Sequence, residues 1–576
     1  MPVCSPSADK LETKSENLGE VITGNRIESS LYELKMLQKS TCLKLCQKDL
    51  TAQDILNFKD LIKDEYVVQW QVDSLPAAVK ARSQKTGEYV YETGFSLGYE
   101  STSTDEPKQS YLNNHVHITI NYNQVPSTTE SEEEKQYHVI LFEVEPRSIA
   151  YPSGENWEET CRQAVSGNGG QRYSLDETHP GPVIYTYSVD WKETPTTWDD
   201  RWHNYLALQG EGQIHWFSII NSLMIVFFLS GLVAMIMART IRRDFMKYME
   251  EEKDEVEESG WKQVRTEVFR APRFKTLFSV LVGSGVQVIS MCVVTMVFAV
   301  LGFLSPSNSG SLTTAAIVLY VWMGVAAGYS SSRIYMTFQG NHHTRNTVVT
   351  AVAFPGSVFG ISFFLNFFLW YKGSSGAFPF TTMLAIMALW FCISVPLCFL
   401  GSRLAYRQEP IKLPGTVAII KKPIPDQKWY MNPVFSVMMG GILPFGAIFI
   451  ELFFIMSSIW LHRYYFLFGF LFLVFVILVI TCAEMSVVMC YFQLCSEDWE
   501  WWWRSYLTSG ASAFYMFLYA IFYYATRLDL DGFVPSLLYY GYSLILCLFF
   551  FVLTGTIGHL ACFWFVRKIY QVIHQD

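Results

Sequence analysis

Long apolar runs dominate the second part of the chain and constrain its fold more than any other feature. Nine such runs of about 20 residues or more occur in the 576-residue sequence: 214–238, 277–304, 312–337, 346–371, 380–402, 435–460, 464–492, 504–526 and 535–566. A helix of about 20 apolar residues crosses a hydrocarbon core of about 30 Å. In lipid, helices satisfy every backbone polar group within one segment. The sequence therefore predicts an all-α bundle of nine transmembrane helices over residues 214–576.

Charge separates this part from the residues before it. Residues 1–213 carry 33 Asp and Glu against 19 Lys and Arg, whereas residues 214–576 carry 19 against 24. The first part is therefore expected to be an acidic domain outside the membrane. The acidic balance also argues against nucleic acid as a partner.

The basic residues of the short loops predict the orientation. Ten Lys and Arg lie in the loop 239–275 and six in 403–434, and both loops follow odd-numbered runs. The loops 305–311, 372–379, 461–463 and 527–534 carry one or none. Cytoplasmic loops are enriched in Lys and Arg. We therefore expect residues 1–213 in the lumen, and the loop 239–275 and the tail 567–576 in the cytosol.

The start of the chain is unusual for a protein with a large lumenal domain. Residues 1–20, "MPVCSPSADKLETKSENLGE", contain no apolar core of the kind that a signal peptide needs. A truncated or alternative start is the interpretation favoured here. The alternative is that the first apolar run directs translocation of everything before it.

Period-two alternation predicts strands in residues 1–213. It is clear in 115–122 and 182–189, while 137–145 and 65–72 are further strand candidates. One amphipathic helix is expected at 51–66. Many strands and few helices favour an all-β, β-sandwich-like domain.

Four cysteines lie in this domain, at positions 4, 42, 46 and 161. A lumenal compartment permits disulfides, and Cys42 with Cys46 is the nearest pair. A free or buried thiol is the alternative, because sequence does not fix connectivity.

Two carboxylates lie deep within apolar runs, Glu451 and Glu484. A charge at the centre of a membrane helix costs at least about 2.5 kcal/mol, so such residues usually face protein or water. They could serve a proton relay or a polar contact with cargo, or be structural. Gln287, Asn366 and His559 are weaker candidates, which we expect to form hydrogen bonds between helices.

Small residues recur at helical spacing in two places, Gly324 with Gly328 and Gly356 with Gly360. Such pairs let helices approach closely, which is a packing signal. No set of nucleophile, base and orienting group is evident, nor a phosphate-binding glycine loop. His342 and His343 lack a third ligand nearby. The sequence thus indicates neither an enzyme nor a cofactor.

Residues 495–510, "CSEDWEWWWRSYLTSG", lie between two of the apolar runs on the predicted cytosolic side. Aromatic belts sit at the headgroup level, so Trp499, Trp501, Trp502 and Trp503 are expected there. Ser496, Glu497 and Asp498 are expected to form the turn. Arg504 is expected to pair with one of the acids. A role of these acids in binding a cytosolic partner is an alternative.

Several long stretches together resemble one known family. In chain order they are "SENLGEVITGNRIE", "YETGFSLGY", "YLNNHVHITI", "GSGVQVISM", "GYSSSRIYMTFQG", "PLCFLGSRLAYR", the run from "FGFLFLVFVILVI" through "SEDWEWWWRSYLTSG", and "FVRKIY". They resemble the transmembrane nine superfamily, the nonaspanins, over nearly the whole chain. The resemblance implies a lumenal domain, nine membrane helices and residence in Golgi and endosomal membranes. It also implies a role in sorting membrane proteins with glycine-rich helices, and so in adhesion and phagocytosis.

Two features depart from the family pattern. The family normally begins with a signal peptide, and it usually ends in Lys-x-Asp or Lys-x-Glu, which resembles a coat-protein retrieval signal. Here the chain ends in "HQD", with His574 in place of the lysine and Asp576 last. Histidine is mostly neutral at cytosolic pH, which puts retrieval through this tail in doubt.

Two functions compete. In the first, the chain sorts other membrane proteins, with lipids and membrane-protein cargo as partners and coat proteins at its loops and tail. In the second, it transports protons or ions through Glu451 and Glu484. Inverted repeats would favour transport, and none is convincing in the sequence.

Overall fold

The structure is a computed structural model. It describes residues 2–7, 9, 11–13, 17–22, 24, 26–82, 89–101, 109–125, 136–151, 157–166, 171–177, 181–202, 205, isolated positions between 220 and 246, and residues 260–301, 310–374, 376–415, 417–460, 468–528 and 532–573.

The chain forms two compact units. One contains residues 1–15 and 26–213, and the other contains residues 16–25 and 214–576. The division between the two units falls near residue 213. The short segment 16–25 is an exception, because it belongs with the helices of the second unit. Its helix α1 (Leu18–Ile22) packs against α7 (Ser311–Trp322), where the Gly19 N–H donates to Thr314 Oγ1 at 2.8 Å.

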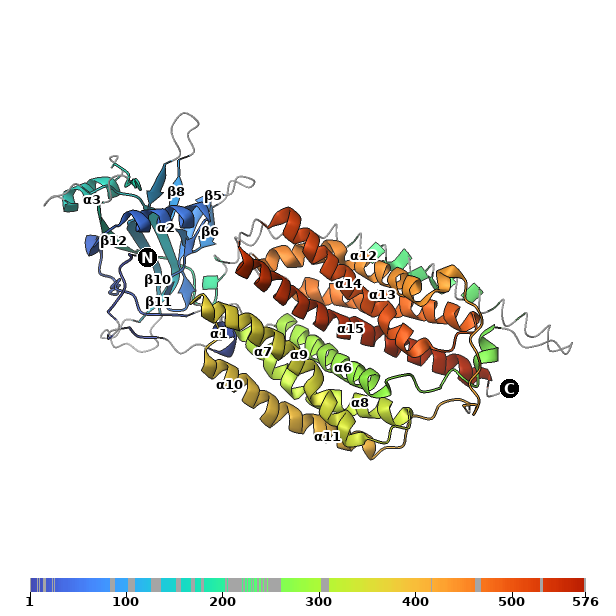
Figure 1. Cartoon of the computed structure of the whole chain (residues 1–576). Helices are drawn as coiled ribbons and strands as arrows, with labels where there is room; N and C mark the ends of the chain where they lie inside the picture. Colours follow the sequence, from blue (N-terminus) through green and yellow to red (C-terminus); the bar gives the residue numbers. More distant parts are fainter. Residues whose placement is uncertain are drawn as a thin grey trace. The chain divides into compact units, whose positions relative to one another are not determined.

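A six-stranded sheet organises the N-terminal unit (Figure 1). Its strands, in spatial order, are β1 (Ser40–Asp49), β12 (Pro182–Glu193), β10 (His115–Gln124), β11 (Tyr137–Arg147), β5 (Ala78–Arg82) and β6 (Tyr89–Thr93). β10 runs parallel to β12 and antiparallel to β11. Three two-stranded ribbons accompany the sheet: β2 (Val67–Val68) with β7 (Phe95–Ser96), β3 (Gln71–Val72) with β4 (Leu75–Pro76), and β8 (Gly98–Glu100) with β9 (Ser110–Leu112).

One face of this sheet is apolar, because alternate side chains of a strand point to the same side. Val183 and Tyr185 of β12 pack against Ile55 and Phe58 of α2 (Ala52–Lys63). Further along the same strand, Tyr187, Val189 and Trp191 pack with Val116 and Ile118 of β10 and with Phe95 of β7. The opposite face carries the polar side chains of His115, Thr186 and Ser188, which are all buried.

The predicted strands at 115–122, 137–145 and 182–189 are present, as is the helix at 51–66. Thr51 caps α2 reciprocally with Asp54, which explains why the helix begins there. The sandwich geometry is only partly present. Among the described residues, the layer facing the large sheet consists of short ribbons and α2 instead of a second full sheet. The predicted strand 65–72 is divided between β2 and β3.

The disulfides differ from the predicted pairing of Cys42 with Cys46. The structure joins Cys4 to Cys46 and Cys42 to Cys161, the latter on α3 (Trp157–Val165). The prediction was wrong because Cys42 and Cys46 lie four residues apart on β1. A strand rises about 3.3 Å per residue, which separates their Cα atoms far beyond the reach of a disulfide.

The second unit is helical (Figure 1). Its remaining elements are η3 (Gly260–Val264), α6 (Lys275–Val300), α8 (Gly324–Thr337), α9 (His343–Tyr371), α10 (Phe380–Leu389), η4 (Trp390–Ser394), α11 (Val395–Tyr406), η5 (Trp429–Met431), α12 (Pro433–Trp460), α13 (Phe468–Cys495), α14 (Trp501–Arg527) and α15 (Phe533–Ile573). Eight of the nine predicted runs coincide with helices or helix pairs in this set. The first run, 214–238, lies largely outside the described residues.

Six helical stretches of the described chain are long and apolar enough to cross a membrane: 275–300, 311–337, 343–371, 380–406, 471–495 and 533–571. This makes the chain a multi-pass membrane protein. The count of nine spans stays a prediction. The α12 and α14 helices are 28 and 27 residues long, but over their described residues neither is both long and apolar enough to be counted as a span.

Two of these spans are interrupted at the same level. The α7 helix ends at Trp322 and α8 begins at Gly324, while η4 is a π-helical turn between α10 and α11. The two breaks lie against each other, because a Cβ added at Gly324 would lie 3.0 Å from the Ser394 carbonyl oxygen. Gln287 of α6 donates to the Tyr320 carbonyl, one turn before the break in α7, at 2.8 Å.

Candidate functional site

The tryptophan-rich turn between α13 and α14 connects distant segments of the second unit. Trp499, Trp501 and Trp502 are buried, and they form one apolar cluster with Trp261, Phe278 and Tyr570 among others. Phe278 comes from α6 and Tyr570 from the end of α15. The turn therefore joins elements that are more than 200 residues apart in the chain.

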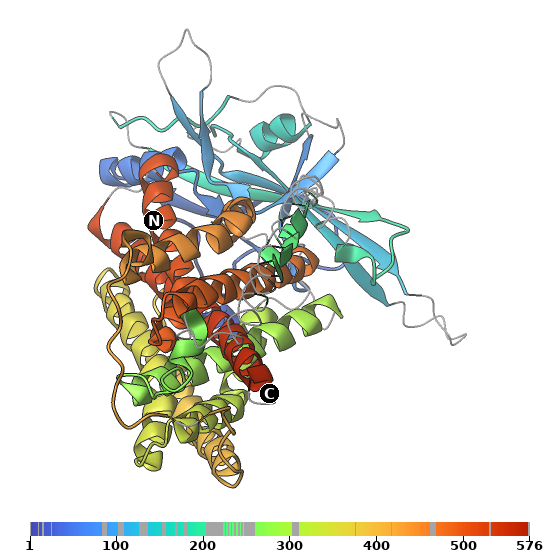
Figure 2. The same cartoon turned by 90° about the vertical axis from the view of Figure 1, so that its right-hand side faces the viewer.

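Each of three indole N–H groups in the turn donates to a backbone carbonyl of a distant segment. Trp501 Nε1 donates to Val268 at 2.8 Å, Trp503 Nε1 to Arg273 at 2.7 Å and Trp499 Nε1 to Lys422 at 3.2 Å. The first two acceptors lie in the predicted cytosolic loop 239–275 and the third in the predicted cytosolic loop 403–434. Both views place the green segment near residue 265 beside the end of α15 (Figure 1, Figure 2).

An ion pair holds the turn together. Arg504 Nη1 lies 2.9 Å from Asp498 Oδ2, and both side chains are buried. Arg504 Nη2 donates further to the Met431 carbonyl at 2.7 Å. A buried charge pair needs such additional bonds to offset the cost of leaving water. The pairing of Arg504 with one acid of the turn was predicted. Its partner is Asp498, while Glu500 faces Lys421 at 3.4 Å.

The predicted lipid-facing belt is wrong for three of the four tryptophans. Trp499, Trp501 and Trp502 have exposed fractions of 4%, 0% and 2%, and only Trp503 is partly exposed. Tryptophan suits both settings, because its ring is apolar and its N–H needs one acceptor. For Trp499, Trp501 and Trp503, loops supply the acceptors that headgroups would supply in a belt.

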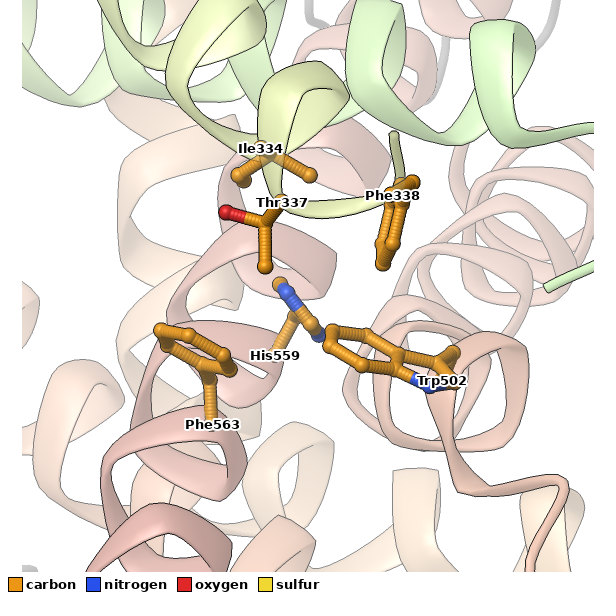
Figure 3. A pocket seen from close by; sticks show the side chains of 6 residues that line it. All are labelled: Ile334, Thr337, Phe338, Trp502, His559 and Phe563. Carbon is orange, nitrogen blue, oxygen red and sulfur yellow. The ribbon is translucent and has the colours of Figure 1, made fainter. Parts of the chain in front are cut away.

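His559 of α15 lies next to this cluster and is fully enclosed. Its Nδ1 lies 3.1 Å from Ser505 Oγ of α14, which is a hydrogen bond between two helices. Figure 3 shows His559 with Trp502, Phe563, Ile334, Thr337 and Phe338 around a small cavity. The cavity holds about 10 Å³, the room of one water molecule. It is too small for an organic ligand.

Two further predicted polar residues have structural partners. Gln287 bonds across to α7, as described above. Asn366 is buried at the end of α9, where its Oδ1 accepts from the Phe378 N–H at 2.8 Å and its Nδ2 donates to the Phe378 carbonyl at 3.3 Å. Asn366 thus holds the loop between α9 and α10.

The two intramembrane carboxylates do not form a described pair. Glu451 lies on α12, and its side chain is outside the described part of the chain. Glu484 lies on α13, half-buried, and no hydrogen bond or ion pair of its carboxylate is found among the described residues. The tail residues His574 and Asp576 also lie outside the described residues.

The two glycine pairs differ in their surroundings. A Cβ added at Gly328 would lie 2.0 Å from the Cys398 carbonyl oxygen of α11, and one at Gly401 of α11 would lie 2.0 Å from the Val325 carbonyl oxygen. The helices α8 and α11 therefore meet backbone to backbone. A Cβ at Gly360 would meet nothing within 4 Å, and at Gly356 the nearest atom, of Trp390, is at an ordinary 3.4 Å. The second pair thus makes no close helix contact, contrary to the packing prediction.

Sequence reasoning missed the contribution of the loop 260–274. Glu267 is buried and forms an ion pair with Arg270, whose Nη2 also donates to the Ala418 carbonyl at 2.8 Å. The only available signal was the spacing of three residues between an acid and a base, which is common on surfaces. Within the described residues, no group of three or more His, Cys, Asp or Glu side chains could hold a metal ion.

These observations define a multi-pass membrane protein with a sheet-containing N-terminal domain, whose helix ends are joined by buried tryptophans. The family model described as Endomembrane protein 70 matches residues 1–533. Transmembrane 9 superfamily member 10 of Arabidopsis thaliana is 47% identical, over 100% of this chain and 91% of the relative. Transmembrane 9 superfamily member 4 of Homo sapiens is 43% identical, over 100% and 91%.

The chain therefore belongs to the transmembrane 9 superfamily, as its motifs predicted. A third relative, from Dictyostelium discoideum, is 43% identical over 99% of this chain and 90% of its own length, and its name includes the words phagocytic receptor 1a. The names of these relatives are those of membrane proteins or receptors and not of enzymes. No solved structure matches the chain.

Proposed function

We propose that the chain sorts other membrane proteins in Golgi and endosomal membranes by holding their glycine-rich transmembrane helices against its own. The observation that carries this proposal is the second glycine pair, on α9. A Cβ at Gly360 would meet nothing within 4 Å and one at Gly356 would make only an ordinary contact with Trp390 of η4, whereas Gly324 and Gly328 lie against the backbone of η4 and α11. Small residues at this spacing allow close approach of two membrane helices.

The exposed side chains around this pair suit a helix in lipid. On α9, Val352, Phe363 and Phe364 are all exposed, and all are apolar. Membrane helices associate through packing and not through the hydrophobic effect, since lipid tails are equally apolar. A smooth glycine surface bordered by large side chains provides such packing.

The experiment is co-purification of the full chain with a membrane protein that has a glycine-rich transmembrane segment. Gly360→Leu and Gly356→Leu should reduce the recovered cargo. Gly446→Leu on α12 is the matched control, since a Cβ at Gly446 also meets nothing within 4 Å. Equal recovery from all three variants would exclude this surface as the cargo site. Gly324→Leu is unsuitable, because it would disrupt contact with Ser394.

We place the N-terminal domain in the lumen and the tail in the cytosol. The two disulfides support this, because disulfides persist in oxidising compartments. Protease protection of residues 26–213 in sealed microsomes tests it. For the tail, we propose that coat proteins bind it weakly. His574→Lys should then increase Golgi retention in cells, and unchanged distribution would argue against retrieval through this tail.

Transport is the second candidate. Glu484 favours it, since a half-buried carboxylate without a described partner is costly to keep in a membrane helix. If Glu484 carries protons or ions, Glu484→Gln should abolish a flux that the wild type shows in reconstituted vesicles. Absence of flux in the wild type under pH and ion gradients would remove this candidate.

A further inference from the structure

The segment between α11 and α12 presents two consecutive isoleucines to solvent. Ile419 and Ile420 have exposed fractions of 99% and 84%, the highest of the large apolar side chains in the described residues. Removing such apolar side chains from water in contact with a partner is favourable. Nothing in the described part of the chain covers them.

This tip is held on both sides by hydrogen bonds. Before it, the Ala418 N–H donates to the Thr266 carbonyl at 3.1 Å, and the Ala418 carbonyl accepts from Arg270. After it, the Lys422 carbonyl accepts from Trp499, and the Lys422 amino group donates to Gln263 Oε1 at 2.9 Å. The isoleucines therefore project from fixed points, so their exposure is a built feature of the loop.

The two segments that form and hold the tip are rich in basic residues, although Glu500 of the neighbouring turn pairs with Lys421. Residues 260–275 and 407–428 together carry ten Lys and Arg and three Asp and Glu. Lys421 follows the isoleucines directly, and its side chain remains 61% exposed beside Glu500. Adjacent basic and apolar residues are typical of elements that bind an anionic lipid surface, where the apolar side chains enter the headgroup region.

Other exposed apolar side chains lie at or near the starts of two helices, α6 and α12. Phe274 precedes α6, Val434 lies in the first turn of α12, and Trp429 lies just before it, and each is more than 70% exposed. The starts of membrane helices lie at the interface with lipid headgroups. In Figure 2 the orange segment that joins α11 to α12 runs along the outside of the helices.

We propose that Ile419 and Ile420 insert into the headgroup region of an anionic membrane leaflet, with Lys421 at the lipid phosphates. The segment 417–422 then forms a membrane-surface anchor that is additional to the transmembrane helices. Its link to Trp499 fixes the turn between α13 and α14 at a defined depth. This inference does not depend on cargo binding, since it concerns lipid alone.

The test places a polarity-sensitive fluorophore at Ile420→Cys in the full chain, after replacement of Cys292, Cys392 and Cys495, the free cysteines of the described residues that are not buried, by Ser. The protein is reconstituted in phosphatidylcholine vesicles with and without phosphatidylserine. With phosphatidylserine, the emission should shift to shorter wavelength, and a headgroup-level quencher should quench it. A probe at Glu409→Cys, on the same segment and exposed, is the control and should stay in water in both.

Lys421→Gln should weaken the membrane-bound state of the probe about fivefold, since each basic residue near an anionic surface contributes about that factor. High salt should act in the same direction. The proposal fails if the Ile420→Cys probe stays accessible to iodide in both vesicle types. It also fails if the probe leaves water only after a cytosolic protein fraction is added, which would indicate a protein partner.

Discussion

Replacement of Gly328 by Ala should destabilise the helical unit, although Ala is the better helix former. An added Cβ lies 2.0 Å from the Cys398 carbonyl oxygen, whereas ordinary contact begins near 3.4 Å. The clash is with backbone, so no side-chain rotation relieves it. Gly401 makes the reciprocal contact with Val325, also at 2.0 Å. The helices α8 and α11 would have to separate along this contact.

Two effects of opposite sign determine the size of the change. Overpacking costs about 1–3 kcal/mol, and a clash with backbone belongs at the upper end. Helix propensity favours Ala over Gly by about 1 kcal/mol. The expected net loss is therefore about 2 kcal/mol. Gly360→Ala is the matched control, because its Cβ meets nothing within 4 Å and only the propensity gain remains.

The assay is the apparent unfolding temperature of the purified full chain in detergent, at one fixed scan rate because unfolding is commonly irreversible. Gly328→Ala should unfold several degrees below the wild type, and Gly360→Ala at or above it. If Gly328→Ala unfolds at the wild-type temperature or higher, the close contact of α8 with α11 does not exist. That result would refute the reasoning.

Three further predictions concern the turn and the N-terminal unit. Trp501→Phe should lower the free energy of unfolding by about 1–3 kcal/mol, because it leaves the Val268 carbonyl without its donor. It should also speed protease cleavage within residues 260–274. Trp503→Phe should have less effect, because Trp503 is partly exposed. Asp498→Ala should lower the free energy of unfolding by about 3–5 kcal/mol, because it leaves the charge of Arg504 buried and unpaired. A smaller decrease in unfolding temperature than the one caused by Gly328→Ala would contradict this. Burial, with smaller repulsion from His117 and Arg147, lowers the pKa of His115 from 6.5 to about 3. The unfolded chain therefore binds the extra proton between these values, so stability is fully present above pH 6.5 and should fall by about 2 kcal/mol by pH 5. Urea unfolding of the full chain, monitored through proteolysis of residues 26–213, measures this pH dependence. The stability of His115→Gln should fall less between pH 6.5 and pH 5.

The sequence predicted the helices and strands better than the contacts between them, for a physical reason. The bounds of α6, α9 and α12 follow from apolar length, which is a property of one segment. The strands β10 and β12 follow from alternation, also within one segment. The pairing of Cys4 with Cys46 and of Cys42 with Cys161 depends on which strands and helices meet, which no single segment determines.

The glycine pairs illustrate the same limit. Gly324 with Gly328 and Gly356 with Gly360 have identical spacing and both lie in apolar helices. Spacing predicts that a helix can approach and does not say whether one of this chain's own helices does so. In the structure η4 and α11 lie against the first pair, and no helix of the described chain approaches the second pair closely. The packing prediction therefore holds for the first pair and not for the second.

The tryptophans between α13 and α14 were predicted to face lipid headgroups, and most of them are buried in protein instead. The sequence nevertheless marked a turn that connects distant parts of the helical unit. A belt tryptophan gives its N–H to water or headgroups, so its loss disturbs little within the protein. Here Trp499, Trp501 and Trp503 give their N–H groups to carbonyls in two loops. Residues 418–422 cannot move away from the helices without breaking the Trp499 bond and the bonds of Ala418 to Thr266 and Arg270. Any partner that binds these loops, whether lipid or protein, therefore acts directly on the start of α14.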